Sequence, residues 1–167
     1  HALILTCQHV VAGQQTMKVT FPDNQQFQGV VLGTDKFGAD LGALEIAAKV
    51  GASLQVNWVP VAGSQPKQFE QVLKVGYPAA TNRLMDVGQG SAVTASDTLW
   101  VATEARSGDS GGGIFNLNGE LISVLHSRRM DDGSTVAASY KRTAEFYERV
   151  CGRWFQRPMP PEPNRPP

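Results

Sequence analysis

Short apolar runs separated by turn residues dominate the chain. In residues 16–21, for example, Met17 and Val19 alternate with Lys18 and Thr20, which is the period of a strand with one buried face. Clusters of Pro, Asp, Asn and Gly separate many of these runs. Many short strands at this spacing predict an all-β sandwich or barrel. The predicted strands are residues 2–6, 16–21, 27–32, 41–46, 71–75, 90–94, 99–103, 113–116, 121–126 and 135–140.

The C-terminal part of the chain has a different pattern. In residues 141–155, apolar side chains recur at every fourth position, at Phe146, Val150 and Trp154, which predicts one face of a helix. Residues 156–167 are rich in proline, which predicts an extended tail or linker outside the core. A spacer is the favoured interpretation of this tail, and a ligand for a proline-reading partner is the alternative.

Composition and charge exclude several classes of protein. The 167 residues fit one domain, or two half-domains that share an interface. Lys plus Arg number 15 and Asp plus Glu number 15, so the basic excess typical of a nucleic-acid binder is absent. No apolar run approaches the roughly 18 residues that can span a bilayer. The two cysteines, Cys7 and Cys151, are far apart in the sequence; two free thiols are the favoured interpretation, and one disulfide between them is the alternative.

The strongest chemical signal is a Gly-Asp-Ser-Gly-Gly string at positions 108–112. Serine is a weak nucleophile that needs an adjacent base and a pocket of donors for the developing oxyanion. Glycines on both sides of Ser110 allow a sharp turn that directs backbone N–H groups at one point. Without further signals, the string could also be a glycine-rich hairpin loop.

Two other motifs supply the partners that such a serine needs. His9 follows an apolar strand, and Asp40 stands at the head of another apolar run. Residues 40–50 fit a strand or a helix, and the glycines nearby favour a strand through Ile46. Each residue alone would be interpreted as structural. Together, in the order His, Asp, Ser, they predict a nucleophile, a base and an orienting acid.

These motifs together resemble the trypsin- or chymotrypsin-like serine peptidase family, and its compact bacterial-type members most closely. The resemblance is carried by Leu-Thr-Cys-Gln-His ending at His9, by Asp-Leu-Gly-Ala-Leu from Asp40, and by Gly-Asp-Ser-Gly-Gly around Ser110. Gly113 stands where the family has proline. The Gly-Tyr-Pro turn at positions 76–78 is a softer match.

The resemblance implies an all-β fold of two antiparallel six-stranded barrels with a C-terminal α-helix. The family usually has one or two strands ahead of the strand that leads to His9, so the first barrel is expected to be incomplete. The chain alone is therefore expected to aggregate more readily than a longer one. The expected peptidase domain is residues 1–155, with the first barrel at about 1–60, the second at about 61–140, the helix at about 141–155 and the tail at 156–167.

The resemblance also implies a role for each site residue. His9 is the general base, Asp40 orients it, and Ser110 is the nucleophile. The backbone N–H groups of Gly108 and Ser110 form the oxyanion hole, and no metal or cofactor is required. In family members activated by cleavage, the carboxylate equivalent to Asp109 pairs with a freed N-terminus. His1 lies too close to His9 to serve, so Asp109 is expected to have another partner.

The substrate pocket is less well defined by the sequence. The resemblance implies a pocket floor at Glu104, which would favour Lys or Arg in the substrate, and a wall with His126 and Arg128, which would favour acidic residues. The alternative is that Glu104 is a surface residue paired with Arg106.

Two other functions compete with the peptidase. One is an α/β-hydrolase-type esterase, which the chain order of the motifs disfavours. The other is a catalytically silent protease-like binding module. The expected partner is a protein or peptide substrate, with no nucleic acid and no membrane span. Oligomeric state and localisation are open, with export to the periplasm or medium favoured.

Overall fold

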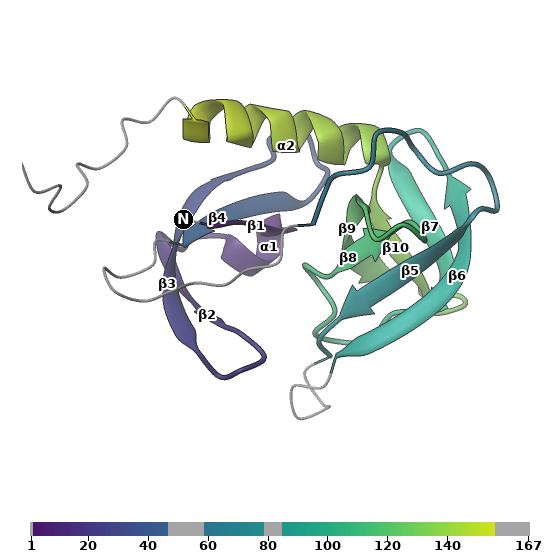
Figure 1. Cartoon of the computed structure of the whole chain (residues 1–167). Coiled ribbons are helices and arrows are strands. Elements are labelled where there is room, and N and C mark those ends of the chain that lie inside the picture. Colours follow the sequence, from purple (N-terminus) through teal and green to yellow (C-terminus); the bar gives the residue numbers. More distant parts are fainter. Residues whose placement is uncertain (1, 47–58, 79–84, 156–167) are drawn as a thin grey trace, which may run out of the picture.

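The computed structural model describes residues 2–46, 59–78 and 85–155, with the backbone alone for residues 153–155. The predicted tail at 156–167 lies outside this range. The chain forms two antiparallel β units, which lie beside each other under one long helix (Figure 1). The predicted all-β class with a C-terminal helix is confirmed, and the α/β-hydrolase alternative is wrong, because the serine string leads directly into a strand, Gly113–Phe115, and not into a helix.

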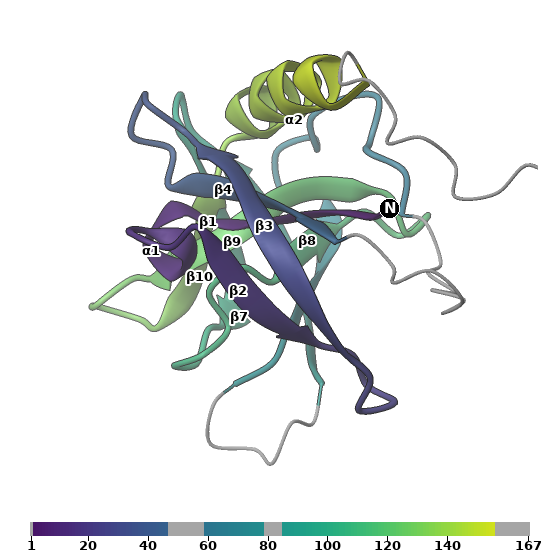
Figure 2. The same ribbon diagram turned by 90° about the vertical axis from the view of Figure 1, so that its left-hand side faces the viewer.

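The first unit is an open sheet. Its strands are β1 (Ala2–Cys7), β2 (Thr16–Thr20), β3 (Gln26–Thr34) and β4 (Leu41–Ile46), in the order β1-β4-β3-β2. Figure 2 views this unit from its own side, with β2 and β3 in front. The strand interpretation of residues 41–46 is correct. The short helix α1 (Gln8–Val11) was not predicted, since four residues are too few to show a helical period.

The second unit is a closed barrel with the order β10-β7-β6-β5-β8-β9. A closed barrel leaves no strand edge unpaired. Its interior is lined by small and branched apolar side chains, among them Val72, Leu99, Val101 and Ile114. The strands are β5 (Gln71–Gly76), β6 (Asp86–Thr94), β7 (Thr98–Glu104), β8 (Gly113–Phe115), β9 (Leu121–Arg128) and β10 (Ser134–Ala138).

Helix α2 (Tyr140–Phe155) packs its apolar face over the junction of the two units. Phe146 and Val150 are buried there in a cluster with Leu41 of the first sheet and Val124 of the barrel, as the four-residue spacing predicted. Burying a side chain of this size contributes roughly 1.5–3 kcal/mol. The helix therefore fixes the two units to each other, and so fixes the residues that each carries.

Candidate active site

His9 and Asp40 are brought together by the pairing of β1 with β4. Cys7 lies opposite Leu41 in this ladder, so the residues just after Cys7 and just before Leu41 are adjacent. The backbone N–H of His9 donates to Asp40 Oδ1 at 2.9 Å, and His9 Nδ1 lies 2.6 Å from Asp40 Oδ2. A carboxylate oxygen can only accept, so the proton of a neutral His9 resides on Nδ1 and Nε2 is the basic nitrogen.

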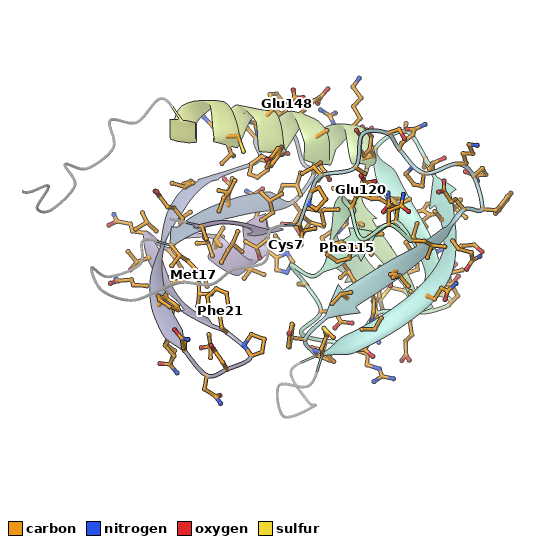
Figure 3. All side chains as sticks on the ribbon, viewed as in Figure 1. Cys7, Met17, Phe21, Phe115, Glu120 and Glu148 are labelled. Carbon is orange, nitrogen blue, oxygen red and sulfur yellow. The ribbon has the colours of Figure 1, made fainter. Side chains whose placement is uncertain are left out.

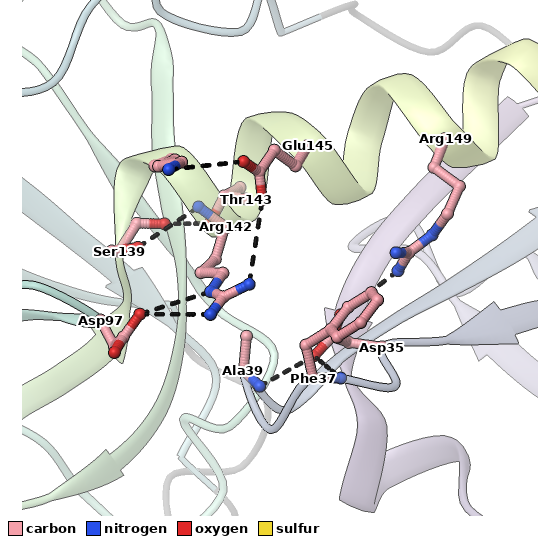
Figure 4. A network of polar contacts seen from close by, with 10 residues as sticks. Asp35, Phe37, Ala39, Asp97, Ser139, Arg142, Thr143, Glu145 and Arg149 are labelled. Atoms are coloured by element: carbon pink, nitrogen blue, oxygen red, sulfur yellow. Dashed lines mark hydrogen bonds and ion pairs between the residues drawn. The ribbon is translucent and has the colours of Figure 1, made fainter.

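The turn that leads into Asp40 is held by the buried carboxylate of Asp35. Asp35 Oδ2 accepts the N–H groups of Phe37 and Ala39 at 2.9 Å each, and Oδ1 lies 3.2 Å from the Arg149 guanidinium of α2 (Figure 4). Burial by itself raises the pKa of Asp35, but the two N–H donors and Arg149 outweigh it and lower the pKa. Asp35 thereby ties the turn before Asp40 to the helix.

The serine string forms the loop between β7 and β8. Gly108 has φ +98° and Gly111 has φ +90°, a region that side-chain-bearing residues rarely adopt. Within the described part of the chain, the N–H groups of Gly108 and Ser110 donate to no other protein group. Ser110 Oγ donates a long hydrogen bond of 3.4 Å to the backbone carbonyl of His126. The loop thus leaves both candidate oxyanion donors available.

The sequence could not name the partner of Asp109, and the structure shows that it is Lys74. The side chain of Asp109 is fully buried, and its Oδ2 lies 2.8 Å from Nζ of Lys74 on β5. Lys74 Nζ also donates to Asp86 Oδ2 at 2.6 Å and to the Glu104 carbonyl at 3.0 Å. Burial alone lowers the pKa of Lys74, but its bonds to Asp109 and Asp86 outweigh burial and raise it. Lys74 is therefore a buried cation at neutral pH.

Sequence reasoning missed Lys74, although the strand pattern contains a signal. In β5, the buried positions alternate at Val72, Lys74 and Gly76. A lysine in the inward series of an alternating strand must have a buried counter-charge, because an unpaired buried charge costs too much free energy. Strand alternation alone could have marked Lys74 for this reason, but it could not have named Asp109.

The carbonyl of Leu125 on β9 joins the two parts of the site. It accepts the N–H of Gly111 from the serine loop and the Sγ–H of Cys7 from the end of β1, both at 2.9 Å. A Cβ placed on Gly111 would lie only 2.4 Å from Thr6 Oγ1, so the loop packs directly on β1. Ser110 is thereby held against the segment that leads into His9.

Cys7 is a neutral thiol in this arrangement. Burial, followed by the charge of Asp40, raises the pKa of Cys7 to about 12. Both cysteines are free thiols, as predicted. Cys7, His9 and Asp40 place ligand atoms within 4.8 Å of one another, which is a geometry that a metal ion could use. In this group, His9 Nδ1 and Asp40 Oδ2 are already hydrogen-bonded to each other.

A cleft of about 460 Å³ opens beside the serine loop. Its walls come from both units, with Ile4, Met17 and Thr20 on the first sheet and Tyr77 and Phe115 on the barrel side. Figure 3 shows Met17 on the first sheet and Cys7 and Phe115 near the line where the units approach each other. The serine loop, residues 108–113, lines the same cleft. An extended chain lying there would pass Ser110.

The predicted pocket residues are spread over the barrel. Glu104 is largely exposed and its carboxylate lies 3.5 Å from Arg106, which is the surface arrangement given as the alternative. Arg128 is exposed near the end of β9. His126 is half-buried, and this burial lowers its pKa. The charge of Asp40 acts in the opposite direction but has the smaller effect. Only His126 contacts the serine, through its backbone, so the substrate-pocket roles of all three stay predictions.

Two β units with a His–Asp pair on one and a glycine-flanked serine on the other define the class of chymotrypsin-like folds. The family model for a trypsin-like peptidase domain matches residues 1–124. The chain belongs to this trypsin-like peptidase family.

Several known proteins are similar to the chain. It is 26% identical over 148 residues to the serine protease Do-like HtrA of Lactococcus lactis, covering 80% of this chain and 36% of that protein. It is 30% identical to the "Probable periplasmic serine endoprotease DegP-like" of Hahella chejuensis, covering 82% and 30%. An inactive form of the Rv3671c protease of M. tuberculosis superposes with a TM-score of 0.74 at 19% identity, covering 95% and 80%, which shows likeness of fold. The chain spans about a third of the length of these curated relatives.

Proposed function

We propose that the protein is a serine endopeptidase in which Ser110 attacks the peptide carbonyl and His9 is the general base. The observation that carries this proposal is the pairing of His9 Nδ1 with Asp40 Oδ2 at 2.6 Å. That bond assigns the basic role to Nε2 of the imidazole. The serine loop packs on β1 just before His9, which supports Ser110 as the group whose proton Nε2 takes.

The reaction would proceed in two acyl-transfer steps. His9 accepts the Ser110 hydroxyl proton as Oγ bonds to the carbonyl carbon, and then returns that proton to the leaving amine. Water hydrolyses the acyl-enzyme by the same route. Asp40 stabilises the imidazolium and holds its ring orientation. The N–H groups of Gly108 and Ser110, which have no other protein acceptor in the described residues, would stabilise the oxyanion.

The substrate in this proposal is an extended protein or peptide chain bound in the cleft between the units. The cleft has apolar walls on both sides of the serine loop, which suits the side chains of an extended segment. No metal or cofactor takes part in these steps. We also propose an exported protein, because a periplasmic DegP-like protease is among its relatives. None of the helices in the described ranges could span a membrane.

Labelling with a fluorophosphonate tests the proposal directly. The reagent should modify the folded protein at Ser110, located by mass spectrometry of the peptides, and the protein should cleave an unfolded protein substrate. Ser110→Ala should lose the label and lower turnover by about 10⁶-fold, because the three side chains act as a unit. Ser64→Ala, at an exposed serine outside the cleft, is the matched control and should keep both properties.

Two results would reject the proposed function. A folded protein that takes no label would be the silent binding module, and a Ser110→Ala variant with more than a tenth of the activity would place the nucleophile elsewhere.

A further inference from the structure

Asp109 lies between the two residues whose N–H groups would form the oxyanion hole. Its side chain is completely buried, against Lys74 of β5. Its Oδ2 accepts from Lys74 Nζ and from the Arg106 N–H at 2.9 Å, and its backbone carbonyl accepts the Gly112 N–H at 2.8 Å. The position of this one residue therefore determines the course of the backbone on both sides of it.

The Asp109 carboxylate has little freedom to move. A Cβ on Gly76 would lie 2.4 Å from Asp109 Oδ1, so this oxygen packs directly on the backbone of β5. Within the described chain, Oδ1 has no hydrogen-bond partner. The ion pair with Lys74 and the bond from the Arg106 N–H are thus the polar contacts that hold the carboxylate in place.

Lys74 is as enclosed as its partner. Its side chain is 1% exposed, and its Nζ has three oxygen acceptors, from Asp86, Glu104 and Asp109. These acceptors come from β6, the end of β7 and the serine loop, so one ammonium group joins three separate segments at this end of the barrel. A cation with three fixed acceptors has a defined position, in contrast to an exposed lysine.

We propose that Lys74 is a positioning residue for the oxyanion hole, acting as a built-in cation that fixes Asp109 and thereby the Gly108 and Ser110 N–H groups. This inference rests on the proposed function. It means that the serine loop is assembled by a side chain of the same barrel and needs no freed chain terminus or added partner to reach its working geometry.

The physical reason is the cost of an uncompensated buried charge. Without the Lys74 ammonium, the Asp109 carboxylate would be buried with no counter-charge, and Asp86 would face the same space. The carboxylate would then have to turn toward water. Turning Asp109 would rotate the peptide units on either side of it and so change the directions of the N–H groups of Gly108 and Ser110.

The first variant to examine is Lys74→Met, which keeps the length of the side chain and removes its charge. Turnover per folded molecule, counted by active-site titration, should fall by about 10²-fold, which is the usual effect of losing one oxyanion donor. KM should change by less than about threefold, since the cleft walls are untouched. Lys141→Met, at an exposed lysine of α2, is the matched control and should leave kcat and KM unchanged.

Amide NMR gives a readout that does not require activity. The ¹H–¹⁵N resonances of Gly108 and Ser110 should shift in Lys74→Met and should not shift in Lys141→Met. If the wild-type protein takes no label while these resonances still move, the proposed function fails and Lys74 only orders the serine loop. If the wild type is active and Lys74→Met has the same kcat and the same two resonances, the positioning role is rejected alone.

A double variant covers the case in which Lys74→Met does not fold. Lys74→Met with Asp109→Asn removes both charges, so no buried carboxylate is left uncompensated at position 109 and the chain should fold. The ionic anchor is still absent, so kcat should stay at least tenfold below wild type. A double variant with wild-type kcat would overturn the inference.

Discussion

The two β units hold their candidate catalytic side chains by opposite means. In the closed barrel, the serine loop rests on a completely buried ion pair, Lys74 with Asp109. In the open sheet, His9 and Asp40 have side chains 50% and 28% exposed, and their mutual bonds are at the surface. The open unit has no such buried ion pair among its described residues, and it is held instead by contacts outside itself, with α2 and with β9 of the barrel. A fixed candidate nucleophile and a solvent-accessible candidate base therefore coexist in one site.

Removing the exposed side chain of His9 tests this comparison most strongly. His9→Ala should lower turnover by about 10⁶-fold, as much as loss of the nucleophile, if the members act as a unit. Peptide-cleavage rates of the variant and the wild type, measured under the same conditions, check this loss. A His9→Ala variant that keeps more than a tenth of the activity would assign the base to another group.

The acid on the same sheet should give the next largest effect. Asp40→Asn keeps the size of the side chain but favours the wrong imidazole tautomer, and in a triad of this kind it lowers kcat by about 10⁴-fold. Because His9 and Asp40 lie at the surface, the free energy of unfolding should change little. Steady-state kinetics and urea unfolding of the same sample separate the two effects. A variant that keeps wild-type kcat would remove Asp40 from the mechanism.

Local patterns predicted most of the strands and the C-terminal helix, because each depends on side-chain periodicity over a few residues. The alternation in β2 and the apolar face of α2 at Phe146 and Val150 are examples. Helix α1 was missed because it is a single turn fixed by the Asp40 backbone, whose carbonyl accepts the Gln8 N–H at 3.0 Å. No local pattern records a contact of that kind.

The site was only partly predictable for the same reason. Three motifs, each local, gave His9, Asp40 and Ser110 as candidates. Lys74, the partner of Asp109, is 35 positions away, on β5. The group that joins the two units is the backbone carbonyl of Leu125. A carbonyl is present at every position, so nothing in the sequence could distinguish this one. Contacts through the backbone and between distant charges needed the three-dimensional structure.

The smallest predicted effect concerns the contact that ties the open sheet to α2. Asp35→Asn keeps one side-chain oxygen, which can accept from Arg149 or from the N–H groups of the turn. It loses the charge, and one of these buried donors is left without a good acceptor. The variant should unfold with about 1–3 kcal/mol less free energy, the usual cost of an unsatisfied buried polar group. Urea unfolding measures this loss. Asp131→Asn, at an exposed aspartate paired with Arg129, is the matched control and should change stability by at most about 1 kcal/mol.

The pH dependence of the same contact gives a second check on Asp35. Its pKa is lower in the folded protein than in the unfolded chain, where an aspartate titrates near 3.9. The contribution of the charged group to stability is therefore complete above about pH 4 and is lost as the pH falls through the lower folded value. The difference between wild type and Asp35→Asn should accordingly stay constant from pH 7 to 5 and shrink below pH 4. If that difference persisted unchanged at pH 2, the ionised carboxylate would not be what fixes the turn before Asp40, and the open sheet would owe its order to apolar packing under α2 alone.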